Sequence, residues 1–214
     1  MKKSLKLGAI LTCILSGLTS PTYAKMYNPG LETSMEKKYN LDLIGDFSGK
    51  EVEKIGYVMD KVDEKIDRKE KRIKYFTIKK TKDLKCMGKD CDGAACLTEK
   101  TIELRDNIKE NYLLDKYSLP QFKKTLAHEI GHLVYNGLLL SNDEIFNEPW
   151  KNPFISNKAG FISDYAKTGD SEDFAETFSE WISNENYNSK NKAVKEKINF
   201  LKEFVGKKYP KFSP

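Results

Sequence analysis

Hydrophobic residues recur three and four positions apart in several segments, and this spacing predicts amphipathic helices. The first helix is expected to begin after Ser48, a residue type that commonly caps helix N-termini, and to extend to about Arg72. A second helix should open at Leu119–Pro120 and end at Asn136–Gly137, a pair typical of helix termination. Its apolar face is formed by Phe122, Leu126, Ile130 and Leu133.

Two more helices are predicted towards the C-terminus. The stretch GDSEDFAETFSEWI predicts a strong helix with a cap at Asp170 or Ser171, and its aromatic residues are expected in the core. The tail from Asn191 predicts a last helix that ends near Gly206. A long loop is expected to join the helix that ends at Gly137 to the one that begins near Asp170.

Alternation of apolar and polar residues predicts two short strands, RIKYFTIKK at 72–80 and KTIELRD at 100–106. The Cys- and Gly-rich segment between them is interpreted as a loop. Residues 25–48 contain Asn-Pro-Gly and Gly-Asp-Phe-Ser-Gly and are interpreted as an irregular N-terminal arm. A chain of 214 residues with 39% hydrophobic content can fill one core. The pattern therefore predicts an α+β fold with a single domain over residues 49–214.

The first 24 residues have the features of a secretory signal peptide. MKKSLK is basic, LGAILTCILSGL is apolar, and TYA places small residues at the −3 and −1 positions of a cleavage site. The apolar run is shorter than the roughly 20 residues that span a bilayer, which disfavours the alternative of a retained membrane anchor. We therefore expect a secreted protein without stable membrane insertion.

The net charge of the chain bears on which partners the protein is expected to bind. Removal of residues 1–24 strips three lysines and no acid, so the formal charge falls from +5 to +2, from 34 basic and 32 acidic residues. The remaining charges are interleaved, which is typical of a solvated surface. We therefore expect no nucleic-acid partner, and we expect a monomer.

Three cysteines remain after that cleavage: Cys86, Cys91 and Cys96. Export makes a local disulfide plausible, although the odd number leaves one thiol over. The alternatives are three reduced cysteines or a second metal site, and the latter lacks histidines for a usual zinc set. The sequence leaves the pairing open.

The chain contains two histidines, and both lie in TLAHEIGH, residues 125–132. Positions i and i+4 of a helix point the same way, so His128 and His132 can share one metal ion. Glu129 is displaced enough to hold a water rather than bind the metal. A catalytic zinc site needs one more protein ligand and an open position. Gly131 is expected to permit close packing inside the helix.

The best candidates for the third ligand are Glu172 and Glu176, which again lie four apart on one helix face. We assign Glu172 to the metal. We assign Glu176 to the free ring N–H of a ligand histidine, whose tautomer it would fix. The reverse assignment and a purely solvated acidic face are the alternatives.

Together, His128-Glu-Ile-Gly-His132 and the later stretch from Tyr165 to Glu176 resemble the catalytic domain of the anthrax-lethal-factor-like peptidases, a gluzincin family that includes secreted Pro-Pro endopeptidases. The resemblance is specific over residues 120–182. It implies a zincin-like fold with a small sheet, an active-site helix and a second, glutamate-bearing helix. It further implies that KTIELRD is the edge strand that aligns the substrate, whereas the Cys-rich segment is not part of the family pattern.

The resemblance also implies site roles. His128, His132 and Glu172 would bind one Zn²⁺ ion per chain, Glu129 would be the general base, and Tyr165, seven residues before Glu172, would assist catalysis. The expected reaction is hydrolysis of peptide bonds in a peptide or protein substrate. A secreted zinc-dependent amidase or cell-wall hydrolase is an alternative, as is a non-catalytic zinc-binding module, although the latter has no need of Glu129.

Overall fold

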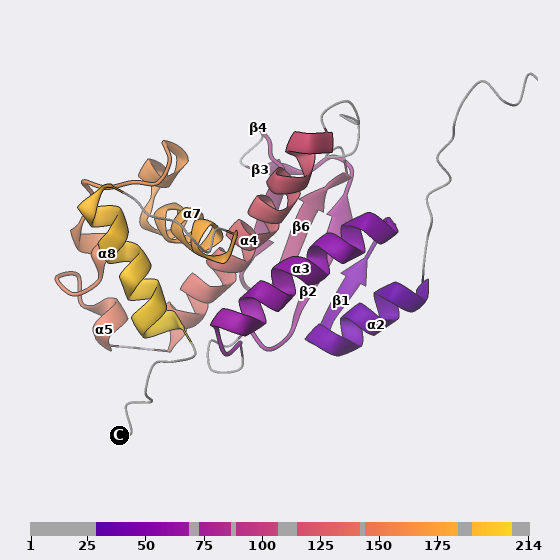
Figure 1. Ribbon diagram of the computed structural model, residues 1–214, viewed down its shortest axis with the longest axis horizontal. Coiled ribbons are helices and arrows are strands. Elements are labelled where there is room, and N and C mark those ends of the chain that lie inside the picture. The colour runs from indigo at the N-terminus through magenta and orange to yellow at the C-terminus, as the bar shows by residue number, and fades with distance from the viewer. Residues whose placement is uncertain are drawn as a thin grey trace, which may run out of the picture.

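The computed structural model describes residues 29–68, 73–86, 89–106, 115–141, 144–183 and 190–206. The predicted signal peptide lies outside these residues. The described chain is a mixed α+β fold, as the sequence predicts. Figure 1 shows the sheet and its helices at one end and a helical region at the other, with α4 (Asp115–Leu140) running between them.

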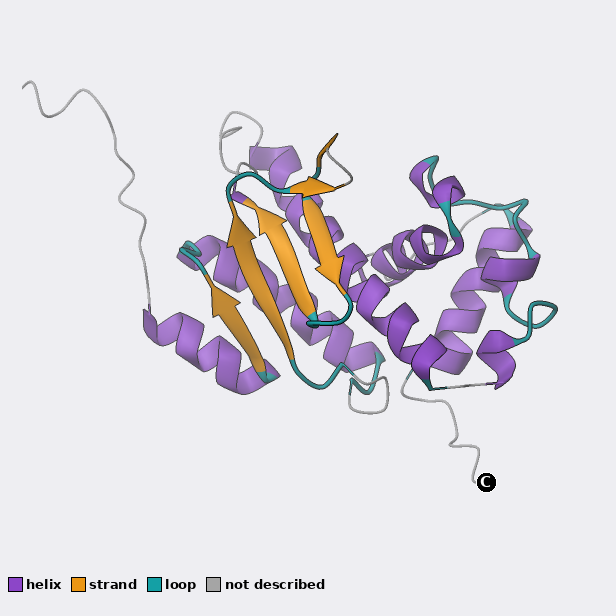
Figure 2. Cartoon of the chain, turned by 180° about the vertical axis from the view of Figure 1, so that it is seen from behind, coloured by secondary structure: helices purple, strands orange, loops and turns teal. Residues whose placement is uncertain are grey.

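A four-stranded mixed sheet has the strand order β1-β2-β6-β5. β1, β2 and β6 are parallel, and β5 pairs antiparallel with β6 at the edge. Figure 2 shows the helices of this region behind the sheet, so they cover one of its faces. The four strands are β1 (Leu41–Ile44), β2 (Phe76–Thr81), β6 (Thr101–Arg105) and β5 (Gly93–Cys96).

The assignment of KTIELRD as the edge strand is wrong. KTIELRD forms β6, which pairs on both sides, whereas the two edge strands are β1 and β5, the latter from the segment interpreted as a loop. Gly93, Ala94, Ala95 and Cys96 show no alternation of apolar and polar residues, so their extended form depends on pairing with β6. Before β5, β3 (Lys85–Cys86) and β4 (Lys89–Asp90) form a small separate ladder.

The interpretation of residues 25–48 as an irregular arm is also wrong where the structure describes them. Residues 29–39 form α2 (Pro29–Tyr39), and β1 follows as a strand of the main sheet. Tyr39, Leu41 and Phe47 are buried in the core, and the Tyr39 hydroxyl donates a hydrogen bond to Asp60 Oδ1 at 2.6 Å. These few apolar residues show no clear period, and contacts with α3 (Gly49–Lys65) order them.

The predicted helix start at Ser48 is confirmed. Ser48 Oγ accepts a hydrogen bond from the Glu51 amide, and the Glu51 carboxylate accepts one from the Ser48 amide at 2.6 Å, which completes a capping box. α3 ends at Lys65, before the expected Arg72. The backbone becomes extended at Ile66, whose side chain is buried in the core.

α4 is longer than the sequence predicts. It continues through Asn136–Gly137, because Leu138 beyond this pair is buried in the core and adds a further apolar position to the helix. The expected loop after it contains α5 (Glu144–Asn147), α6 (Pro153–Ser156) and the short 3₁₀ helix η3 (Tyr165–Thr168). No helix among the described residues is long and apolar enough to cross a membrane.

The last two predicted helices are present. α7 (Asp170–Ser183) begins one residue before the helix expected from a cap at Asp170, and it buries Phe174, Phe178 and Trp181. α8 (Lys192–Phe200) begins with an Asn191 side-chain cap, and a π-helical turn, η4 (Leu201–Val205), leads to Gly206. Both helices lie on the opposite side of α4 from the sheet (Figure 1).

A buried ion pair joins α7 to α8. Lys197 is fully buried, its Nζ lies 2.6 Å from Asp173 Oδ2, and it also donates a hydrogen bond to the Gly160 carbonyl. Lys197 looks like one more surface lysine in a Lys-rich tail, so the sequence does not reveal its burial.

Replacing Lys197 by methionine should lower the free energy of unfolding by about 3–5 kcal/mol, because Asp173 is then left buried without a counter-charge. Lys195→Met, at an exposed position of the same helix, is the matched control and should change stability by less than about 0.5 kcal/mol. Denaturant unfolding of both variants measures the difference. Equal stability of the two variants would show that the ion pair does not hold α7 and α8 together.

Candidate metal centre

The candidate site lies where α4 meets α7. The two helices approach closely at Gly131, where a methyl group would lie 2.9 Å from the Ala175 Cα. Gly131 therefore permits the close packing that the sequence suggested. It also explains how residues more than forty positions apart come together, because Gly131 lies next to His132 and Ala175 next to Glu176.

His128, His132 and Glu172 form a group that can hold a metal ion, with their candidate ligand atoms all within 4.8 Å of one another. The two Nε2 atoms are 3.0 Å apart. Glu172 Oε2 lies 3.1 Å from the Nε2 of His128 and 3.2 Å from that of His132. The structure thus brings together the three residues that the sequence analysis assigned to the metal.

These distances fit a zinc ion. Ligand atoms of a tetrahedral zinc site are about 3.3 Å apart when each lies about 2.0–2.1 Å from the metal. The other ring nitrogen of each histidine has its own partner, so a neutral imidazole can keep its proton there and turn the Nε2 lone pair inwards. Lone pairs converging from three side chains repel one another unless a cation or a proton lies between them.

Two side chains orient the histidines. His128 Nδ1 lies 2.9 Å from Glu176 Oε1, which is the contact that the sequence analysis assigned to Glu176. His132 Nδ1 lies 2.8 Å from Ser171 Oγ, a partner that sequence reasoning considered only as a helix cap. A hydrogen bond to the second ring nitrogen fixes both tautomer and ring orientation. Lys124 Nζ, 3.8 Å from Glu176 Oε2, adds a positive charge beside Glu176.

In the metal-free protein, contacts among His128, Glu172 and Glu176 shift the pKa of each side chain. Burial lowers the pKa of His128, but hydrogen bonds with Glu172 and Glu176 outweigh it and raise the pKa to about 9. Burial raises the pKa of Glu172, but contacts with both histidines lower it to about 2. The hydrogen bond from His128 dominates at Glu176 and lowers its pKa to about 2. Without a metal, His128 therefore carries a positive charge between the two carboxylates and offsets part of their negative charge.

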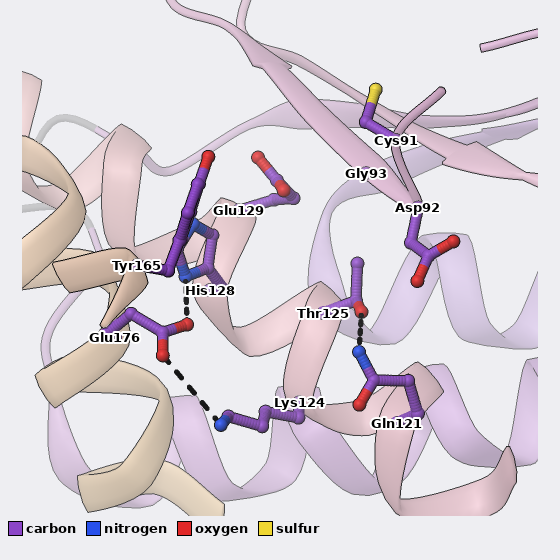
Figure 3. A pocket seen from close by; sticks show the side chains of 10 residues that line it. All are labelled: Cys91, Asp92, Gly93, Gln121, Lys124, Thr125, His128, Glu129, Tyr165 and Glu176. Carbon is purple, nitrogen blue, oxygen red and sulfur yellow. Dashed lines mark hydrogen bonds and ion pairs between the residues drawn. The ribbon is translucent and has the colours of Figure 1, made fainter. Parts of the chain in front are cut away.

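Glu129 and Tyr165 lie beside the metal group, and Tyr165 also interacts with the Glu172 side chain. Glu129 is buried, and burial raises the pKa of its carboxyl above the usual range. Tyr165 begins η3 and is exposed, and its ring centroid is 5.8 Å from that of His128. Figure 3 shows both side chains at the same pocket, beside His128.

Two adjoining clefts meet at His128 and Glu129. One, of about 370 Å³, extends over the first half of α4 and includes Gln121, Lys124 and Thr125 (Figure 3). The other, of about 600 Å³, follows β5 past Ala94 and Ala95 to Leu97. Both contain Gly93 and Tyr165, so the candidate metal centre opens onto a groove along the edge strand.

The Cys-rich segment borders this groove. Cys86 and Cys91 form a disulfide, and Cys96 is an exposed free cysteine, which decides the pairing that the sequence left open in favour of one local disulfide. Cys91 borders both clefts and Cys86 borders the larger one. Sequence reasoning missed this contribution to the site, because the spacing of the cysteines carries no information about α4.

No protein-family model matches the chain, and a search of curated proteins finds no significant match.

Metal affinity of the purified metal-free protein should rise with pH. The raised pKa of His128, about 9, means that this imidazole is protonated at pH 7 and must lose its proton to bind a metal. The affinity for zinc is therefore expected to increase about tenfold per pH unit between pH 6.5 and 8. Competition titration with a zinc indicator measures it, and an affinity independent of pH would contradict a protonated His128.

Proposed function

We propose that the protein is a secreted zinc metalloendopeptidase with a zincin-like fold. The observation that carries the proposal is the convergence of His128, His132 and Glu172 beside Glu129, at a groove bordered by a sheet edge. The resemblance of the two helix motifs to the anthrax-lethal-factor-like peptidases supports the same reaction.

His128, His132 and Glu172 would hold the zinc ion. When bound, zinc supplies Lewis acidity, which polarises a carbonyl oxygen and lowers the pKa of a water molecule. Two nitrogens and one carboxylate oxygen form a usual ligand set for catalytic zinc, and they leave a position open for other ligands. Glu176 and Ser171 would hold the imidazole rings in the orientation that the ligand set requires.

Glu129 would act as the general base. Its side chain borders both clefts, so a substrate and a water molecule can reach it. Its raised pKa lies closer to neutrality than that of an ordinary glutamate, which suits a group that takes a proton from the attacking water and passes it to the leaving amine.

Tyr165 would stabilise the negative charge that develops on the carbonyl oxygen. Burial, followed by the nearby carboxylates Glu172 and Glu129, raises the pKa of its phenol, so the hydroxyl keeps its proton and can donate it in a hydrogen bond. Its exposure and its position at the groove support this role, because a substrate in the groove could reach it.

The edge strand favours an extended peptide over other amides. β5 pairs with β6 on one side, and none of the described strands pairs with its other edge. A peptide can add to such an edge through main-chain hydrogen bonds, whereas a glycan-linked amide offers few matching donors and acceptors. This observation places peptidase activity ahead of amidase or cell-wall hydrolase activity.

Digestion of a peptide library tests the proposal, with zinc-loaded and chelated enzyme compared by mass spectrometry. We expect internal cleavage that disappears with the chelator and returns with added zinc. Equal cleavage in both samples would contradict metal dependence. Cleavage of peptidoglycan fragments at amides, without cleavage of any library peptide, would favour the amidase alternative.

A further inference from the structure

Gly93 of the edge strand touches the residues beside the candidate metal centre. A methyl group on Gly93 would lie 2.7 Å from Glu129 Oε1, 2.9 Å from Glu129 Cγ and 2.7 Å from Thr125 Cγ2. Carbon atoms pack at about 3.5–4.0 Å, so no side chain fits there without displacing Glu129 or Thr125. The backbone of β5 therefore forms one wall of the space that holds the Glu129 side chain.

This wall is formed by the backbone and not by a side chain that can rotate. Glu129 is a buried residue of α4. Figure 3 shows the Glu129 side chain extending from α4 towards the strand that carries Gly93. A buried carboxylate between a rigid helix and a rigid strand has few alternative rotamers, so movement of β5 changes where the carboxylate can lie.

A disulfide lies beside the start of β5. It ties Cys91, two residues before Gly93, to Cys86, whose Sγ lies 3.4 Å from the Gly93 carbonyl oxygen. The carbonyl of Asp92 accepts a hydrogen bond from the Arg105 amide at 2.9 Å, which fixes the same segment to β6. The start of β5 thus has a covalent attachment on one side and the sheet on the other.

We propose that Gly93 is a positioning residue for the Glu129 carboxylate and that the Cys86–Cys91 disulfide holds Gly93 against α4. The role in turnover rests on the proposed peptidase function, whereas the contact itself does not. Glycine at this position lets the edge strand approach the base closely enough that strand and base move as one unit.

A double-mutant cycle on stability tests the contact without any activity assay. Gly93→Ala should lower the melting temperature, and the decrease should be at least halved when Glu129 is already alanine, because two of the three close contacts are then absent. Gly169→Ala is the control, since a methyl group there would meet no atom within 4 Å, and any change in melting temperature that it causes should be the same with and without Glu129. An equal decrease in both backgrounds would overturn the contact.

Kinetics tests the positioning role. Gly93→Ala should lower kcat on the order of 10²-fold with KM changed less than about threefold and zinc affinity kept, because the base is displaced while the ligands stay in place. Adding Thr125→Ser removes the Thr125 Cγ2 contact and should restore part of kcat and of the melting temperature. If Gly93→Ala turns over at the wild-type rate, Gly93 has no positioning role.

The cysteines test what holds Gly93. The double variant Cys86→Ser/Cys91→Ser should lower kcat on the order of tenfold with zinc affinity kept, whereas Cys96→Ser, which changes the free cysteine of the same strand, should retain wild-type kcat. Unchanged kcat in the double variant would show that the disulfide does not hold Gly93. If wild-type protein cleaves no peptide, the proposed function fails, and the stability cycle still decides the Gly93–Glu129 contact.

Discussion

Replacing Glu129 by glutamine is expected to lower turnover by about 10²-fold or more and to leave the zinc content at about one ion per chain. The amide keeps the shape of the side chain and loses the ability to accept a proton from water. Glu129 is buried next to His128 but is not one of the three side chains that can hold the metal, so the metal should stay. Peptide cleavage and metal analysis on the same preparation measure both quantities.

Glu144→Gln is the control for this experiment, because Glu144 is an exposed glutamate of α5 away from the groove residues, and its turnover should equal that of the wild type. A Glu129→Gln protein that loses its zinc along with its activity would show that Glu129 is a ligand or a structural residue. Retention of full activity would show that another group takes the proton.

The two glutamates of α7 should differ sharply in their effect on metal affinity. Glu172 Oε2 faces both Nε2 atoms, whereas Glu176 Oε1 faces Nδ1 of His128. Loss of an outer partner typically lowers metal affinity 10- to 100-fold. Glu176→Ala should therefore fall in about that range, and Glu172→Ala, which removes a ligand charge, should lose more than about 100-fold.

Zinc dissociation constants of the two variants decide the assignment, provided that circular dichroism shows both to be folded. If Glu176→Ala loses far more affinity than Glu172→Ala, the ligand is Glu176. The match to the peptidase motif is then displaced by one helical turn, and the role of Tyr165 is withdrawn with it. Equal and small losses would show that neither carboxylate binds the metal.

The helices were largely predictable because their signals are local. The Ser48 and Asn191 caps are short-range hydrogen bonds, and the structure has both. Strands were less predictable. β5 consists of small residues and β1 is only four residues long, so neither shows a period that distinguishes it from a loop. Both strands depend on partner strands distant in the chain.

For the candidate site, the sequence by itself determined which residues share a helix face. His128 and His132 lie four apart, as do Glu172 and Glu176, and the helical period points each pair in one direction. That argument needs no knowledge of how α4 and α7 pack.

Tertiary structure alone decided which of these groups meet. The packing of Gly131 on Ala175 brings Glu172 to the histidines, gives His132 the Ser171 hydroxyl, and leaves Glu176 to orient His128. It also decided that β5 forms one edge of the sheet, with Gly93 against Glu129. Lys197 lies far from Asp173 in sequence, and their pairing is decided in the same way. Helical periodicity acts over a few residues, whereas each of these contacts joins segments that only the packed core brings together.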